Sequence, residues 1–165
     1  MAAGLLEELG EGPGRLSSTG STAGRELASR VRRDLIYLLD TNTCVYVIKR
    51  EAKVLRRLEE HSPNDFGISA ITVAELWFGA AKSSRPQQTR ASVDAFLKPF
   101  EILAFGSEAA ERYAETRLQL EKIGQPIGER DLLIAATAKS RRLTVVTHKV
   151  REFSRVSGLK VEDWR

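Results

Sequence analysis

The sequence predicts an α/β fold with a mostly parallel sheet of four to five strands and helices on both of its faces. From Ile36 onward, short apolar runs alternate with stretches of helical periodicity, the order that builds parallel sheets. The apolar runs lack the alternation of half-exposed strands, as expected of strands covered on both sides. With 165 residues, 42% of them hydrophobic, the chain is about one domain long and buries a sizeable core.

The predicted strands are short apolar segments bounded by turn or cap residues. An aspartate directly follows the first predicted strand, 36–39. The last predicted strand has the weakest sequence signal. The predicted strands cover 36–39, 66–69, 101–105, 143–147 and 159–162.

The predicted helices fill the intervals between these strands. Pro86 is well placed to open one helix, and Gly124 with Pro126 closes the longest. Apolar residues spaced three and four apart place the helices at 41–49, 54–60, 71–82, 86–97, 107–120 and 131–139.

Residues 1–34 differ in composition from the rest of the chain. They hold six of the twelve glycines and no aromatic residue. We predict a poorly ordered extension here, followed by a folded domain over 35–165. No 7–15-residue apolar segment of a secretion signal is present, and no apolar run approaches the ~20 residues of a membrane span.

Cysteine and histidine content limits the metals that the chain can bind. A single cysteine, Cys44, excludes an internal disulfide, and His61 and His148 are too far apart to suggest a Cys/His zinc site. Oxygen ligands are then expected, which favour Mg²⁺ or Mn²⁺. Residues 139–165 carry eight Lys or Arg against three acids, either as a solvated surface or as a patch that faces phosphates.

Asp40 directly follows the first predicted strand. At the carboxyl edge of an α/β sheet, where ligand crevices form, such a carboxylate is a candidate site residue. It is equally an ordinary N-cap for the next helix. The polar neighbours Asn42 and Thr43 fit both interpretations.

Two further acids lie on apolar helix faces. Glu75 shares a stripe with Ile71 and Phe78, and Asp131 heads a stripe with Ile134. Considered alone, Glu75 is expected to be a boundary residue whose side chain reaches water. Considered alone, Asp131 is expected to be an ordinary acid of a helix's first turn. Because unpaired burial of an ionised carboxylate costs several kcal/mol, the three acids together suggest a pocket that needs a divalent cation.

Several segments, in this order and spacing, resemble the PIN-domain toxins of the VapC type. They are Leu38-Leu39-Asp40-Thr41-Asn42-Thr43, 68–76, 126–136, 151–159 and the closing 161–164. The resemblance implies a three-layer α/β/α fold and a cytoplasmic, Mg²⁺-dependent endoribonuclease, with Mn²⁺ as a substitute. It further implies a cognate antitoxin, a homodimer, and transfer or ribosomal RNA as substrate.

The resemblance also implies roles for individual residues. Asp40, Glu75 and Asp131 match the metal-binding acids of the family, and Asn42 and Thr43 match polar positions beside the first acid. For phosphodiester hydrolysis, one or two Mg²⁺ held by these acids would activate a water. Thr43 or Thr147 would position that water.

One departure from the family follows the fourth strand. The family usually has Thr-Asn-Asn or Thr-x-Asp there, whereas this chain has Thr147-His148-Lys149. A protonated lysine cannot ligate a cation, so we expect Lys149 to pair with Asp40 or Asp131 in place of one metal, or to turn toward a phosphate. Glu129-Arg130 is a second departure, since relatives tend to have a proline before this Asp.

Two alternative functions remain open. One is a PIN-like protein that binds RNA or an antitoxin without cleaving, because Lys149 replaces the usual amide or acid. The other is a phosphatase with Asp40 as strand-end nucleophile, which leaves Glu75 unexplained.

Four residues near the motifs have simpler expected roles. Trp77 and Phe78 are expected in the core or against a partner rather than stacked on bases. His148 is expected on the surface, and Cys44 buried in a helix.

Overall fold

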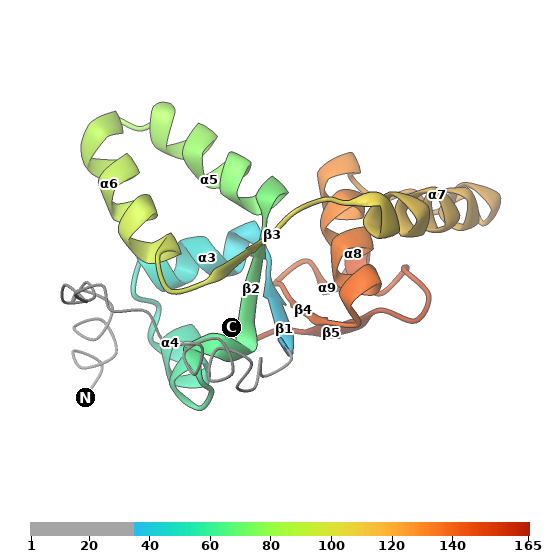
Figure 1. The fold of residues 1–165 in the computed structure, drawn as a ribbon, viewed down its shortest axis with the longest axis horizontal. Coiled ribbons are helices and arrows are strands. Elements are labelled where there is room, and N and C mark those ends of the chain that lie inside the picture. Colours follow the sequence, from blue (N-terminus) through green and yellow to red (C-terminus); the bar gives the residue numbers. More distant parts are fainter. Residues whose placement is uncertain (1–34) are drawn as a thin grey trace, which may run out of the picture.

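A five-stranded parallel sheet forms the centre of the molecule. The structure is a computed structural model, and it describes residues 35–165 (Figure 1); the predicted extension 1–34 lies outside these residues. The strand order is β3-β2-β1-β4-β5, with every neighbouring pair parallel. The strands are β1 Tyr37–Leu39, β2 Phe66–Ser69, β3 Glu101–Leu103, β4 Thr144–Val146 and β5 Lys160–Glu162.

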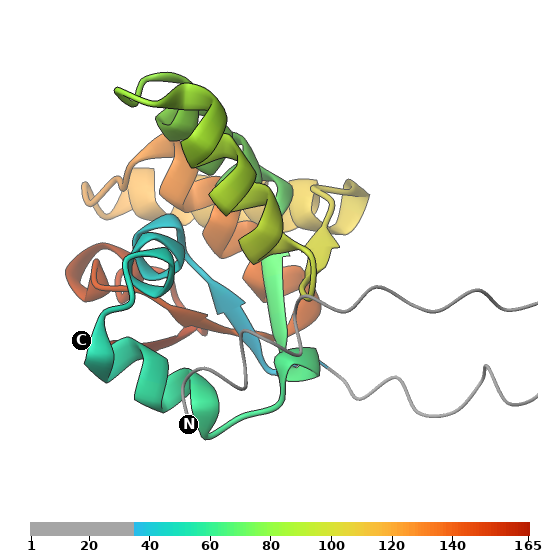
Figure 2. The same cartoon turned by 90° about the vertical axis from the view of Figure 1, so that its left-hand side faces the viewer.

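Helices cover both faces of this sheet, so the predicted α/β class and the three-layer arrangement are confirmed (Figures 1 and 2). On one side lie α3 Thr41–Ile48, α4 Ala52–Glu59, α5 Ala70–Ala81 and α6 Pro86–Leu97. On the other lie α7 Ser107–Lys122, α8 Glu129–Arg141 and the short α9 Val150–Phe153.

The two central strands, β1 and β4, each contribute to two separate apolar cores. In β1, Leu39 packs into the core beneath α3–α6, whereas Leu38 packs into the core beneath α7–α9. In β4, Val146 and Val145 divide in the same way. Successive strand residues point to opposite faces, so strands buried on both sides read as continuous apolar runs.

Local sequence explains where several elements begin and end. Pro86 occupies the first turn of α6, where its missing N–H leaves no helical bond unmade. Gly124, with φ of +65°, follows α7, the left-handed position that favours glycine at a helix end. In β2, a Cβ on Gly67 would lie 3.0 Å from a side-chain atom of Leu103 in β3, so glycine leaves room for that leucine side chain.

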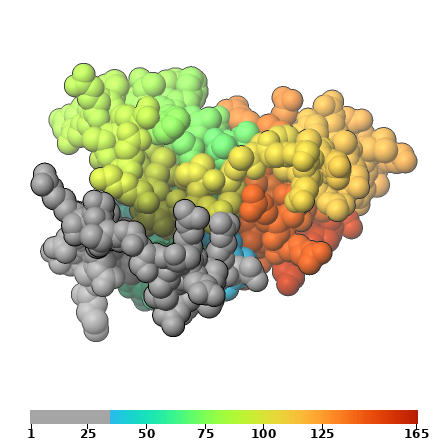
Figure 3. Space-filling model, viewed as in Figure 1, coloured from blue at the N-terminus to red at the C-terminus, as the bar shows by residue number. Residues whose placement is uncertain are grey.

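The α5–α6 hairpin projects from the body of the protein, and its outer surface is visible in Figure 3. Trp77 and Phe78 lie on α5 and are 40% and 56% exposed, so of the two expected roles, core or partner contact, the core is excluded. The Trp77 Nε1–H donates to Asp94 at 2.9 Å, and the Arg90 guanidinium lies 4.1 Å from the Trp77 ring centroid. Trp77 is thus stabilised at the surface by α6.

No helix within residues 35–165 has the length and apolar character needed to cross a membrane.

Candidate active site

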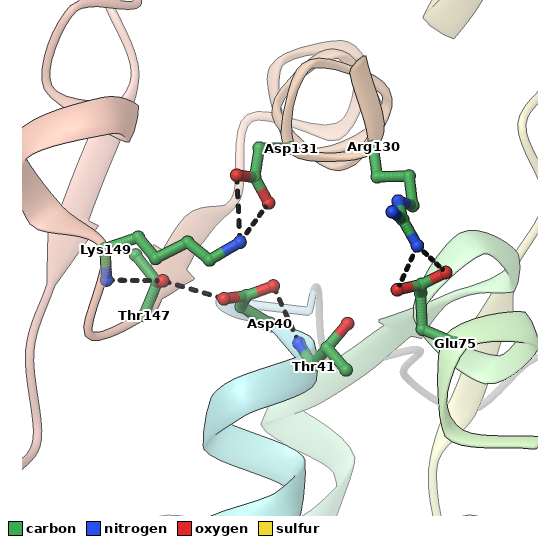
Figure 4. A network of polar contacts seen from close by, with 7 residues as sticks. All are labelled: Asp40, Thr41, Glu75, Arg130, Asp131, Thr147 and Lys149. Carbon is green, nitrogen blue, oxygen red and sulfur yellow. Dashed lines mark hydrogen bonds and ion pairs between the residues drawn. The ribbon is translucent and has the colours of Figure 1, made fainter. Parts of the chain in front are cut away.

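The sheet reverses its direction of winding between β1 and β4. From β1 the chain builds outward to β2 and β3, while β4 and β5 extend the opposite edge. Ligand crevices of open α/β sheets form at such a switch point, outside the carboxyl ends of the strands. Asp40 directly follows β1 and Thr147 directly follows β4, and the Asp40 N–H donates to the Val146 carbonyl at 3.0 Å. The two residues therefore meet at the switch point (Figure 4).

Asp40 is both the N-cap of α3 and a buried acid of the site. Its side chain accepts hydrogen bonds from the Thr41 N–H at 2.7 Å and from the Thr147 hydroxyl at 2.8 Å, and the residue is 1% exposed. Burial raises the pKa of the Asp40 carboxyl, while the hydrogen bonds from Thr147 and Thr41 and the charge of Lys149 act to lower it. The cap interpretation is therefore confirmed, and the same carboxylate lies at the switch point where the site interpretation expects it.

Asp131 lies in the first turn of α8 and faces Lys149. The Lys149 ammonium donates to both Asp131 carboxylate oxygens at 2.9 Å, and the Asp131 side chain is 9% exposed. A Cβ on Gly128 would lie 3.3 Å from an Asp131 oxygen, so glycine leaves room for this carboxylate. The predicted ion pair of Lys149 is thus formed with Asp131.

The charges of both acids act on Lys149. Burial alone would lower the pKa of the ammonium, but the hydrogen bonds and negative charge of Asp131, and the charge of Asp40, outweigh it and raise that pKa. Lys149 is therefore a cation at neutral pH. Its backbone N–H donates to the Thr147 hydroxyl oxygen at 3.0 Å, so a continuous polar chain links Asp40, Thr147 and Lys149.

Glu75 completes the acidic set from α5. Arg130 donates from Nη1 to both of its carboxylate oxygens, at 2.7 and 2.8 Å. The sequence predicted a cationic partner for Glu75 but did not identify Arg130. The available signal was the departure at this position, where a charged residue stands in place of the usual proline.

The remaining candidate residues lie around these acids. The buried Thr43 donates its hydroxyl to the Val146 carbonyl at 2.8 Å, so it ties α3 to β4. Asn42 is half-buried in the first turn of α3. His148 is on the surface as predicted, with Nδ1 3.0 Å from an Asp163 oxygen. Cys44 is buried, also as predicted.

The donor chemistry of the three acids fits a hard divalent cation, since Mg²⁺ prefers carboxylate oxygens. As the side chains stand, no three His, Cys, Asp or Glu within residues 35–165 are grouped closely enough to hold a metal ion. Two acids have cationic partners instead: Asp131 is bound by Lys149 and Glu75 by Arg130. An ion would therefore share these carboxylates with, or take them from, the two basic side chains.

A model of the PIN domain family matches residues 37–159. The chain belongs to the PIN-domain family. Among its relatives in that family is the tRNA(fMet)-specific endonuclease VapC of Salmonella typhimurium, 39% identical over 130 residues that cover 79% of this chain and 98% of the relative. Ribonuclease VapC2 of Rickettsia felis is 40% identical over 132 residues, with the same coverage. These relatives place the PIN chain among the VapC ribonucleases.

Solved structures of PIN toxins have the same fold. The chain is similar to one in the DNA-bound VapBC of S. typhimurium, with a TM-score of 0.75 and 39% identity over 79% of this chain and 99% of that one. VapBC2 of R. felis bound to a promoter DNA fragment gives a TM-score of 0.74 and 38% identity, over 79% and 100%. The predicted family, fold and ribonuclease class are confirmed, and the binding-only alternative is not favoured.

Proposed function

We propose that this PIN-domain ribonuclease is a Mg²⁺-dependent endoribonuclease toxin that hydrolyses RNA at the edge formed by Asp40, Glu75 and Asp131. The main support is the position of Asp40, a buried carboxylate at the switch point of the sheet with Asp131 close by. Burying an ionised carboxylate is costly unless a cation compensates it. A divalent ion bound at the nuclease site would supply that compensation.

The protein's own groups would act as follows. Asp40, Glu75 and Asp131 would hold the ion, with Mn²⁺ as a substitute for Mg²⁺. When bound, Mg²⁺ supplies a Lewis acid that activates water for in-line attack and stabilises charge on the phosphate. The Thr147 hydroxyl, 2.8 Å from Asp40, fixes the orientation of that carboxylate. The Thr43 hydroxyl donates to the Val146 carbonyl, so Thr43 would act by fixing the first turn of α3 against β4.

Within residues 139–165 the basic side chains are exposed except those of Lys139 and Lys149, which are half-buried, and they do not form one surface. Arg141 and Arg142 lie at the end of α8 away from Asp131, on the order of 15 Å along the helix axis at ~1.5 Å per residue. Arg151 lies in α9, two residues after Lys149, whereas Arg165 lies against Tyr46 in the second half of α3. We assign phosphate contacts to Arg151, with single-stranded or loop RNA as the accessible substrate.

Transfer RNA is the first substrate to test, since the S. typhimurium relative is named as specific for tRNA(fMet). We further propose a cognate antitoxin, because the similar solved structures are VapBC complexes. Exposed Trp77 and Phe78, on the same helix as Glu75, offer such a partner an apolar surface near the site. We also propose that the protein forms a homodimer and that it acts on cellular RNA in the cytoplasm.

The test is cleavage of total small RNA by the purified full chain with Mg²⁺ or Mn²⁺, against EDTA. Asp40→Asn should abolish cleavage, whereas the matched control Glu121→Gln should leave it unchanged. Glu121 is also a salt-bridged acid, but it pairs with Arg117 on exposed α7. Cleavage that persists in EDTA or in Asp40→Asn would contradict the proposal.

A further inference from the structure

We infer that Lys149 is a tethered cation that takes the place of one divalent ion beside Asp131, so that the chain binds one Mg²⁺ rather than two. This inference rests on the proposed metal-dependent ribonuclease and specifies how its site is occupied. The resemblance to VapC-type toxins implies Asn or Asp at this position, so Lys149 places a positive charge where a neutral or acidic group is expected.

The Lys149 ammonium lies where a cation shared by Asp131 and Asp40 would lie. The Lys149 Nζ lies 2.9 Å from both oxygens of Asp131. Figure 4 shows the ammonium extending from the end of β4 into the space between Asp131 and Asp40, on the side of Asp40 opposite Glu75. A group that donates to both oxygens of one carboxylate uses the positions through which that carboxylate would hold a metal ion bidentately.

The surroundings hold this lysine in place. Its backbone N–H is bonded to the Thr147 hydroxyl, and the same hydroxyl donates to Asp40. Thr147 therefore fixes both the start of the Lys149 side chain and the carboxylate that it approaches. Because Asp131 is 9% exposed, water compensates little of its charge, and the ammonium remains its main source of compensation.

The other ion pair of the site, between Glu75 and Arg130, is more exposed to solvent. Glu75 is held by Arg130, whose side chain is 65% exposed, so solvent can replace that partner at little cost. A single Mg²⁺ would thus be held by Asp40 and Glu75, with Arg130 released, and by Asp131 in common with Lys149. The Lys149 charge would then stabilise the other side of the phosphate, where a two-metal site has its second ion.

The decisive experiment counts bound Mn²⁺ on the full chain by calorimetry and by electron paramagnetic resonance of the free ion. We expect one ion in the wild type and two in Lys149→Asn, and no change from wild type in Lys139→Asn. Lys139 is the matched control because it is also partly buried but donates to a hydroxyl, Thr116 Oγ1, at 3.3 Å.

Each outcome of the count is informative. Two ions in the wild type, or one ion with unchanged affinity in Lys149→Asn, would overturn the inference and leave the proposed ribonuclease intact. No bound ion in either protein would overturn the metal dependence of the proposed function, together with the inference that rests on it.

A second measurement needs no metal. In EDTA, Lys149→Met should lower the midpoint of thermal unfolding by about 3–6 °C, because it leaves Asp131 buried without a cation. Lys149→Met combined with Asp131→Asn should recover most of that loss, and Lys139→Met should show little loss. Equal midpoints for Lys149→Met and the wild type would overturn the role of Lys149 as a tethered cation.

Discussion

The site contains two carboxylate–cation pairs that are similar in distance and different in environment. Lys149 holds Asp131 at 2.9 Å and Arg130 holds Glu75 at 2.7 Å. The carboxylate is 9% exposed in the first pair and 29% exposed in the second, and the cations are 39% and 65% exposed. Solvent screens the second pair much more than the first.

Because of this difference in exposure, only one of the two pairs is a fixed part of the site. A buried pair that loses one partner leaves an uncompensated charge, which is strongly destabilising. An exposed pair that loses one partner leaves a hydrated charge, which costs little. The Lys149–Asp131 side is therefore built into the fold, whereas Glu75 can exchange Arg130 for another cation.

The largest expected effect is on the rate of RNA cleavage, in which Asp131 and Glu75 should differ. Asp131→Asn should lower the rate of RNA cleavage by about 10²–10³-fold, as expected when a buried electrostatic group is removed from a reacting centre. Glu75→Gln should lower it by about 10-fold, because that carboxylate lies nearer to solvent. Single-turnover cleavage with Mn²⁺ measures both, and equal losses would contradict the distinction between the two sides.

Stability should follow the same order. Lys149→Met should lower the free energy of unfolding by about 1–2 kcal/mol, less than for a fully buried pair because Lys149 is partly solvated. Arg130→Met should change it by no more than the error of the measurement. Urea denaturation in EDTA gives both values. A loss in Arg130→Met as large as that in Lys149→Met would show that exposure does not decide the strength of these pairs.

The pH dependence of stability tests the burial of Asp40. Since burial raises the folded-state pKa of Asp40, the folded chain holds this proton more tightly than the unfolded chain. The resulting stabilisation is fully present below the unfolded pKa, about 3.9, and is lost as the pH rises through the folded pKa.

Asp40→Asn mimics the neutral acid, so in EDTA it should unfold at a higher temperature than the wild type at pH 7. The difference should shrink as the pH falls through the raised folded-state pKa and be absent below about 4. Thermal scans across this range measure the effect, and a variant that is less stable than the wild type at pH 7 would contradict it.

The smallest expected effect concerns competition for Glu75. If Arg130 must leave when a metal ion binds, Arg130→Met should lower the Mn²⁺ concentration for half-maximal binding by about 2–3-fold, as expected for an exposed pair worth a fraction of a kcal/mol. Arg112→Met is the matched control, because Arg112 forms a similar exposed pair with Glu115 on α7. Unchanged Mn²⁺ binding in Arg130→Met would mean that Arg130 does not compete.

The strands show what the sequence could and could not predict. The segment 66–69 is observed as predicted for β2, because a turn precedes it and Ser69 caps the next helix. The third strand was predicted to reach Phe105 but ends at Leu103. Ser69 pairs with Leu103 in the sheet and is the last residue of β2, so β3 has no partner beyond that point. Strand length therefore depended on a neighbour far away in sequence.

The site was predictable to a similar degree. Asp40 could be placed at the sheet edge because the strand that precedes it is apolar and the fold class determines which edge is the carboxyl edge. The partner of Lys149 was left open between Asp40 and Asp131, since only the packing of α8 against β4 decides between them. Arg130 was not identified as the partner of Glu75, because 55 residues and three secondary-structure elements separate them. The short helix α9 was also not predicted, since four residues carry no periodicity.

Asp40 is both the N-cap of α3 and an acid of the site. This double role determines which Asp40 substitutions would be found in cells that survive production of a toxic protein. Cells that survive overexpression would carry inactivated copies of the gene. Most substitutions at Asp40 remove the cap as well as the acid, and these variants should accumulate poorly. Asparagine is as good an N-cap as aspartate, and one base change converts an aspartate codon to an asparagine codon. Among survivors mutated at this codon, asparagine should therefore be enriched in those that still contain full amounts of the protein.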